Sequence, residues 1–504
     1  MTALRRRPRA DAEAAVIVAA GVAVAIVAGC AVVADARSSL TAAAVLAAAA
    51  LVGWATRVHG AGLLVGLLLL GAVDALPGPN AETIHLVRTL QLTDGLAALL
   101  ALALAWIVVT DPAARRPVGV EERMLRGWAA VVLILWMVAG VRADIAHGVP
   151  ILNALFWGRQ YLYLALLSPL FARALGSPSA RQVAFVVVAA GVCVAAAGQM
   201  AAVIAGHPIA VVVHVNQLGQ TEGLLRLYSG ASTLIPAGVP FGLGLALLGT
   251  SRRARLAGGV VCAFAGAGIA VELTRALYLS TVVSLALTIT LWLLVGDAAG
   301  RLGRRRLLQV AAFVAAATAA VVFVQPGTIS HTVVDGVVAR ATSGITEATA
   351  DSTLDSALVA RTIERTDLKA YLGGDWELGK GLLDPSYFYV AEVPGGSIQN
   401  PDVGYLSAVM TIGVVGTIVV YSAFVFGLLR LAVLRVRGRA VAWDWLAFGT
   451  FSWLLMAVGA SVTLAVMIDP IGAVPSAAIL ALACICAPRR GPHAPPRSAT
   501  SSTH

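Results

Sequence analysis

The sequence predicts an all-α membrane protein, a polytopic bundle of about fourteen transmembrane helices with one large extracytoplasmic loop. Three observations lead to this fold class. Hydrophobic residues make up 59% of the 504 residues and charged residues only 12%, whereas a soluble domain carries about 25% charged residues. The apolar residues come in blocks close to the ~20 residues that cross a bilayer as a helix. Basic clusters separate these blocks in a regular order.

The apolar blocks are too long for the strands of a membrane barrel, which alternate over roughly 10 residues. Helices satisfy their own backbone polar groups in lipid, so each block is assigned as one span. The predicted spans are 14–33, 39–56, 60–76, 93–110, 126–142, 152–174, 181–204, 231–249, 256–272, 276–296, 307–325, 403–432, 444–466 and 470–487.

The net charge of +10 has to be interpreted through the topology before it suggests a partner. With these spans, every basic cluster falls in links on one side of the membrane: residues 5–9, 115–126, 252–255, 301–306, 435–439 and 489–497. The positive-inside rule then places that side, and both termini, in the cytoplasm. The charge therefore indicates the lipid bilayer as a partner and does not indicate nucleic acid.

Five cysteines lie inside or at the ends of apolar blocks, which favours packing over disulfides or a metal site, and no metal is expected. Val27 to Cys30 resembles a lipoprotein cleavage box and Ala34 to Ala36 a signal-peptidase site, but the first block is long enough to remain as an anchor. No P-loop is present, so ATP-driven transport by this chain alone is not expected.

The spans divide the chain into a first bundle of about eleven spans (1–325), a large extracytoplasmic loop (326–402), three last spans (403–487) and a disordered basic cytoplasmic tail (488–504). The loop is acidic, with eleven acidic and five basic residues between Gly327 and Asp402. Ser352 and Asp355 have the spacing of a capping box. They predict a helix near 352–372, ended by Gly373 and Gly374.

A few arginines face outward in this topology, against the positive-inside rule: Arg226 before span 8, Arg275 between spans 9 and 10, and Arg361 on the loop helix. Arginine near lipid is costly, so it predicts a compensating function. Guanidinium groups bind phosphate or pyrophosphate through paired hydrogen bonds. The alternative is snorkelling or local pairing, as of Arg275 with Glu272.

Further polar candidates stand at the start of span 6, where Arg159, Tyr161 and Tyr163 could line a cavity. An aromatic belt explains the two tyrosines equally well. The outward histidines show no metal-ligand spacing and are interpreted as solvated loop residues.

Several motifs, in order along the chain, resemble those of one known family of membrane proteins. Gly404-Tyr405-Leu406 followed by Gly413-Val414-Val415-Gly416 resembles the end of that family's periplasmic loop and the span after it. In order along the chain, the other similar motifs are Arg226-Leu227-Tyr228-Ser229-Gly230, Thr274-Arg275-Ala276, the loop arginine Arg361, and Gly379-Lys380-Gly381. The family that these motifs resemble is that of the O-antigen ligases and related polysaccharide polymerases, and the resemblance covers about residues 150 to 435.

The resemblance implies a metal-independent, inverting glycosyltransferase without a cofactor, in a bacterial cytoplasmic membrane. Such an enzyme transfers a glycan from a polyprenyl-pyrophosphate donor to a glycan or glycolipid hydroxyl on the outer face. It implies that Arg226, Arg275, Arg361 and Arg159 bind the pyrophosphate, that Arg275 and Asp402 are catalytic, and that a chain-length regulator or flippase is a possible partner. Asp402 stands where ligases carry a histidine, and it could instead cap the span that follows.

Two other functions remain open from the sequence. A lipid-linked-oligosaccharide flippase or other transporter also has many spans, but such proteins usually carry polar residues near the bilayer midplane and repeated halves. A peptidoglycan polymerase of the shape, elongation and division type has an outer-loop carboxylate but about ten spans. Fold-level analogy alone does not decide among them.

Overall fold

The computed structural model describes residues 85–87, 90–110, 118–176, 219–221, 224–226, 231–272, 275–294, 372–383, 404–436, 444–461 and 470–486, with scattered helical residues between 181 and 200. Several predictions lie outside the described residues. These are the first three spans, span 11, the loop helix before Leu372, the C-terminal tail, and the candidates Arg361 and Asp402.

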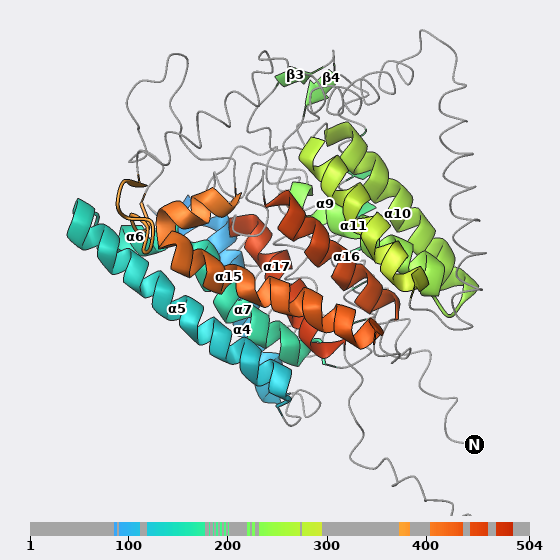
Figure 1. The fold of residues 1–504 in the computed structure, drawn as a ribbon, viewed down its shortest axis with the longest axis horizontal. Helices are drawn as coiled ribbons and strands as arrows, with labels where there is room; N and C mark the ends of the chain where they lie inside the picture. The colour runs from blue at the N-terminus through green and yellow to red at the C-terminus, as the bar shows by residue number, and fades with distance from the viewer. Residues whose placement is uncertain are drawn as a thin grey trace, which may run out of the picture.

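The described chain is helical, as predicted (Figure 1). Its helices are α4 (Leu92–Thr110), α5 (Val120–His147), α6 (Ile151–Trp157), α7 (Arg159–Ala174), α9 (Ala231–Leu248), α10 (Arg252–Glu272), α11 (Arg275–Leu294), α15 (Gly404–Val436), α16 (Trp445–Ala460) and α17 (Pro470–Ile485). Two short antiparallel hairpins were not foreseen: β1 (His85–Val87) with β2 (Leu90–Gln91), and β3 (Gly219–Thr221) with β4 (Leu224–Arg226). Both hairpins fall in predicted links between spans.

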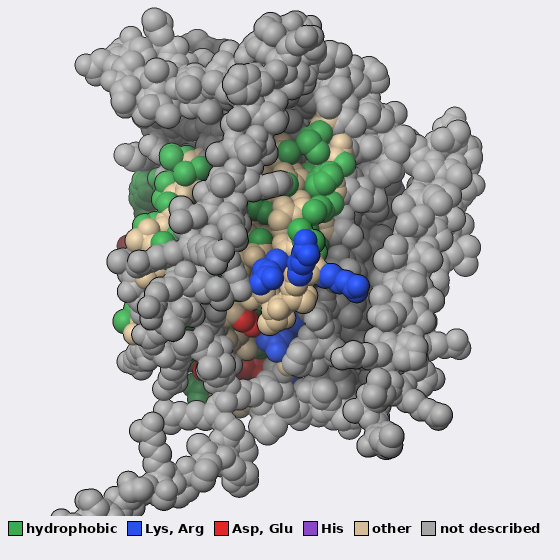
Figure 2. Space-filling model, turned by 90° about the vertical axis from the view of Figure 1, so that its right-hand side faces the viewer, with side chains coloured by type: hydrophobic (Ala, Val, Ile, Leu, Met, Phe, Trp, Pro, Cys, Tyr) green, Lys and Arg blue, Asp and Glu red, His purple; other side chains and the backbone are tan. Residues whose placement is uncertain are grey.

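Three of the described helices are long and apolar enough to cross a membrane: Val120–His147, Arg252–Ala270 and Gly404–Val436. Each carries large apolar side chains on its surface, such as Ile134 (61% exposed), Leu256 (62%) and Ile418 (65%). A soluble protein rarely exposes apolar surface on this scale. Figure 2 shows one face, where hydrophobic side chains cover the upper part of the described surface and a group of basic side chains lies below them. These features indicate a membrane protein.

Two predicted spans are interrupted helices. The predicted span 152–174 is divided at Gly158 into α6 and α7, and α15 contains a non-helical residue at Gly413. α5 ends at His147, and the left-handed backbone of Gly148 (φ 66°) caps it before α6 begins after Pro150. Where the other described helices overlap predicted spans, they begin within a few residues of the predicted positions, except that α5 begins earlier.

Small residues bring the helices of the second half close together. A Cβ atom on Gly242 of α9 would lie 2.6 Å from the backbone nitrogen of Cys262 in α10, and one on Gly258 would lie 2.5 Å from the Ala246 nitrogen. On the other side of α9, Gly449 of α16 accommodates the Phe241 ring. Close backbone approach through glycine is how helices associate in lipid, where hydrophobic burial gives little driving force.

Polar contacts gather the ends of several helices at one end of the bundle. Two of them join the start of α5 to α7 and α15: Glu122–Arg173 and Glu121–Arg430. Two more join the last part of α15 to the ends of α17 and α11: Arg430–Ala483 carbonyl and Arg435–Trp292 carbonyl. α16 begins there too, because its other end at Ser461 meets the start of α15 at Tyr405. Gly244 of α9 packs against the Trp445 carbonyl, so the turn to Arg252 and Arg253 belongs to the same end. We call it the basic end.

Candidate functional site

A stretch of the predicted extracytoplasmic loop packs into the bundle at the end opposite the basic end. This stretch, Leu372–Leu383, is here called the docked segment, and it is drawn in orange beside α6 in Figure 1. Leu372, Leu382 and Leu383 are almost fully buried. Leu382 occupies the gap between α6 and α7, where a Cβ atom on Gly158 would overlap its side chain. The loop therefore contributes to the helical core as well as to the surface.

The docked segment pairs with the backbone of α15 at the point where this helix is broken. Gly413 has φ 71° and ψ 177°, which interrupts the helical hydrogen-bond ladder. Four backbone hydrogen bonds link the two elements: Lys380 N–H to Met410 O (2.8 Å), Gly381 N–H to Thr411 O (3.1 Å), Val414 N–H to Trp376 O (2.8 Å) and Val415 N–H to Glu377 O (3.3 Å). Irregular backbone at membrane depth is tolerated where protein groups satisfy it in this way.

Three glycines make this docking possible. Gly379 (φ 69°), Gly381 (φ 98°) and Gly413 (φ 71°) all have left-handed backbone, which side chains disfavour. A Cβ atom on Gly379 would lie 2.6 Å from the Gly413 nitrogen, and one on Gly381 would lie 2.8 Å from the Ala139 carbonyl oxygen. The Gly379-Lys380-Gly381 and Gly413 motifs, identified separately in the sequence, thus belong to one junction.

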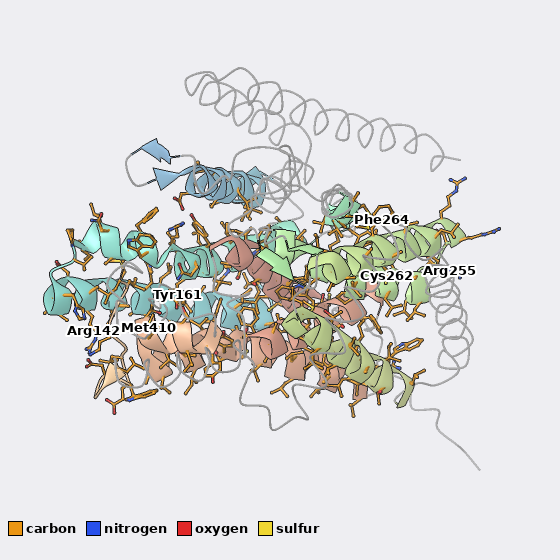
Figure 3. The ribbon with its side chains drawn as sticks, turned by 90° about the horizontal axis from the view of Figure 1, so that it is seen from above. Arg142, Tyr161, Arg255, Cys262, Phe264 and Met410 are labelled. Carbon is orange, nitrogen blue, oxygen red and sulfur yellow. The ribbon has the colours of Figure 1, made fainter. Side chains whose placement is uncertain are left out.

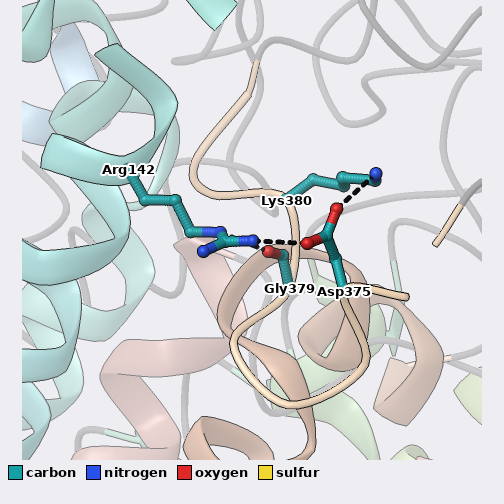
Figure 4. A network of polar contacts seen from close by, with 4 residues as sticks. All are labelled: Arg142, Asp375, Gly379 and Lys380. Atoms are coloured by element: carbon teal, nitrogen blue, oxygen red, sulfur yellow. Dashed lines mark hydrogen bonds and ion pairs between the residues drawn. The ribbon is translucent and has the colours of Figure 1, made fainter. Parts of the chain in front are cut away.

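A polar cluster lies on this junction (Figure 4). The Arg142 guanidinium, near the end of α5, donates from Nε to the Gly379 carbonyl (2.6 Å) and from Nη2 to Asp375 Oδ1 (2.7 Å). Lys380 Nζ donates to the other Asp375 oxygen, Oδ2, at 2.5 Å. All three side chains are partly exposed, at 28% for Arg142, 37% for Asp375 and 20% for Lys380. We call Arg142, Asp375 and Lys380 the junction cluster.

The junction cluster carries two cations and one carboxylate. The hydrogen bond from Lys380, followed by the charges of Lys380 and Arg142, lowers the pKa of Asp375 below its usual value. Asp375 is therefore ionised at neutral pH and is a weak base. With two cations and an ionised carboxylate, the cluster is better suited to holding an anion than to abstracting a proton.

A second, buried cluster lies close by at the start of α4 and α7. Arg159 Nε forms an ion pair with Asp94 Oδ1 at 2.9 Å, and each side chain is only 9% exposed. The Tyr163 hydroxyl donates to the same carboxylate oxygen. The Arg159 guanidinium also stacks over the Phe156 ring, 4.3 Å from its centroid. Arg159, predicted to bind pyrophosphate, therefore has a protein carboxylate as a partner in this structure.

A buried hydrogen bond connects α7, which carries Arg159 and Tyr163, to the broken part of α15. Tyr161 of α7, predicted as a cavity residue, is 1% exposed, and its hydroxyl lies 2.9 Å from the Thr411 hydroxyl in the broken part of α15. Figure 3 shows Arg142, Tyr161 and Met410 toward one end of the bundle and Arg255 at the other.

The remaining predicted ligands are placed only by their backbone or not at all. Arg275 is the first residue of α11, and α11 ends at the basic end, so Arg275 belongs to the opposite end. Arg226 is the last residue of β4, a few residues before α9 begins. Arg361 and Asp402 lie outside the described residues. That these four positions share a cavity with Arg159 stays a prediction.

Arg142 and Asp375 were not predicted from the sequence as site residues. Arg142 closes predicted span 5 on the outward side, so the rule that selected the other outward arginines could also have found it. Asp375 follows two glycines in an irregular stretch, and no spacing marks it as the partner of a residue 233 positions away.

In comparisons with known proteins, no protein-family model matches the chain, and no curated protein does. The fold defines a helical membrane protein with a partly exposed cationic junction at the end opposite its basic end.

Proposed function

We propose that the chain is a membrane glycan polymerase or ligase. It transfers a polyprenyl-pyrophosphate-linked saccharide to an acceptor hydroxyl on the outer face of a bacterial cytoplasmic membrane. The observation that carries this proposal is the junction cluster, where a loop stretch docks into a broken helix and gathers Arg142, Asp375 and Lys380. The resemblance of the Gly379-Lys380-Gly381 and Gly413 motifs to O-antigen ligases and polymerases supports it.

The proposed orientation follows from the charge. The basic end collects Arg126, Arg173, Arg252, Arg253 and Arg430, among others. Basic residues stay preferentially in the cytoplasm, so the junction cluster faces the extracytoplasmic side. A bundle of about fourteen spans with both termini in the cytoplasm completes this topology. A donor carried by a lipid would then reach the cluster from the outer leaflet.

The proposed reaction needs no metal, because protein cations supply the positive charge. The acceptor oxygen attacks the anomeric carbon of the donor sugar while the bond from that carbon to the diphosphate oxygen breaks. The acceptor proton passes to a base, proposed to be Asp402, and polyprenyl pyrophosphate leaves with the bonding electrons. Arg226, Arg275 and Arg361 are proposed to stabilise the charge that grows on the leaving diphosphate.

The proposal predicts that Arg275→Ala and Arg361→Ala each abolish product formation while the protein is still expressed. The assay uses purified protein in lipid nanodiscs with the polyprenyl-pyrophosphate-linked oligosaccharide of the source cells, and it follows product length by electrophoresis. Arg253→Ala removes the same charge from an exposed position at the basic end and should retain activity. Full activity in both outward-arginine variants would count decisively against a glycan transferase.

One observation favours the alternative of a transporter or flippase. α15 is interrupted at Gly413 inside a long apolar stretch, and interrupted helices form the binding sites of many transporters. The ionic groups of the junction cluster, however, lie toward one end of the bundle. Movement of a lipid-linked glycan across liposomes without formation of a glycosidic bond would favour this second function.

A further inference from the structure

Lys380 is held in place more firmly than a loop lysine usually is. Its backbone nitrogen donates to Met410, and the glycines on both sides of it, Gly379 and Gly381, pack against backbone atoms of α15 and α5. Only two of the 36 basic residues in the chain are lysines, and both belong to the loop. The docked backbone therefore fixes the point from which the Lys380 ammonium extends.

Arg142 is fixed from the other side. It stands on α5, which also receives the Leu382 amide at the Ala139 carbonyl (3.2 Å). Its Nε atom is held by the Gly379 carbonyl, directly before Lys380. The two cations thus come from elements far apart in the chain and meet within reach of one carboxylate, as Figure 4 shows.

Asp375 lies between these two cations and binds both of them. One of its oxygens accepts from Arg142 and the other from Lys380, so the carboxylate offsets the repulsion between two like charges in a partly buried place. Guanidinium and ammonium groups brought together in this way bind phosphate oxygens well. All three side chains are partly exposed, so an anion can reach the cluster.

We infer that Asp375 is a positioning residue that holds Arg142 and Lys380 together as cationic ligands for the diphosphate of a lipid-linked donor. This inference rests on the proposed function and adds two diphosphate ligands, Arg142 and Lys380, that were not predicted from the sequence. The lipid tail would lie along the apolar surface of α5 and α15, whose exposed side chains include Ile134 and Ile418.

Farnesyl pyrophosphate is a suitable probe, with farnesyl monophosphate and inorganic pyrophosphate for comparison. Binding is measured by calorimetry on the purified full chain in detergent. Lys380→Gln should weaken farnesyl pyrophosphate binding by roughly tenfold or more, because a charge-assisted hydrogen bond is lost. Lys380→Arg should retain most of the affinity. Asp375→Asn should also weaken binding, and Arg253→Gln, a matched charge change at the basic end, should leave it unchanged.

Hydrogen exchange separates this role from a purely structural one. The amides of Lys380, Gly381 and Leu382 are hydrogen-bonded in the docked segment, so they should stay protected in Lys380→Gln. Loss of protection together with loss of binding in Lys380→Gln would overturn the inference, as would unchanged binding in that variant or tighter binding in Asp375→Asn. Equal affinity of the wild type for inorganic pyrophosphate would overturn the assignment to a lipid-linked donor.

The inference and the proposed function can fail separately. A wild-type protein that binds farnesyl pyrophosphate through Lys380 but never forms a glycosidic bond would contradict the transferase and leave the diphosphate site standing. A protein that forms polymer at full rate in the Lys380→Gln and Asp375→Asn variants would contradict the site and leave the transferase standing.

Discussion

Arg159 is buried in an apolar bundle, where protein groups surround its guanidinium. Asp94 supplies the opposite charge, the Phe156 carbonyl accepts a hydrogen bond from Nη1 at 3.3 Å, and the Phe156 ring covers one face. Removing one member of a buried ion pair leaves the other charge without compensation, which is usually more destabilising than removing both. The same reasoning applies to Glu122 and Arg173 at the basic end.

We expect Arg159→Ala to destabilise the protein by about 3–5 kcal/mol, because the Asp94 carboxylate would stay buried without its guanidinium partner. The double variant Asp94→Asn with Arg159→Gln should lose less than the sum of the two single variants. Thermal unfolding of the purified protein in detergent measures both effects. An unchanged melting temperature in Arg159→Ala, combined with lost donor binding, would instead support its predicted role as a pyrophosphate ligand.

At the scale of elements, the break in α15 and the docked segment depend on each other. The break leaves polar backbone groups that lipid could not satisfy, and the docked segment brings a matching set of donors and acceptors. Glycine is needed on both sides of this contact because the two backbones approach too closely for a Cβ atom. The loop stretch is thus held by backbone pairing, and the junction cluster adds ionic contacts on top of it.

Gly413→Ala should release the docked segment. Alanine at φ 71° is strained by about 1–3 kcal/mol, and its Cβ atom would overlap the Glu377 carbonyl. Hydrogen exchange should then become faster at the Lys380, Gly381 and Leu382 amides. Gly127→Ala is the matched control, because a Cβ atom on Gly127 meets nothing within 4 Å, and alanine in an exposed helix position is neutral or slightly stabilising. Equal exchange in both variants would show that docking does not depend on Gly413.

At the scale of the whole molecule, charge is distributed unevenly along the bundle axis. Contacts among helix ends gather Arg173, Arg252, Arg253, Arg430 and Arg435 at the basic end. The sequence predicts the same asymmetry, because its basic clusters fall in the links on one side of the membrane. Because long apolar helices connect the two ends, we expect a membrane to lie between them.

This topology predicts opposite labelling of two single cysteines introduced into a cysteine-free chain. Arg253→Cys at the basic end should react with a membrane-impermeant maleimide only after the cells are opened. Leu378→Cys, at a 49% exposed position in the docked segment, should react in intact cells or spheroplasts. Labelling of both positions from the same side would contradict the proposed orientation and the outward position of the junction cluster.

The sequence alone was enough to predict the helical membrane class and the approximate limits of the described spans, because apolar length and basic links are local properties of the chain. It also singled out Gly379-Lys380-Gly381 and Gly413 as separate motifs. Only the tertiary structure decided that these motifs meet, that Asp94 is the partner of Arg159, and that Arg142 joins Lys380 through Asp375. Such pairings depend on how helices that are distant in the chain pack together. The pattern of hydrophobicity and charge along the sequence does not specify which residues of two such helices meet.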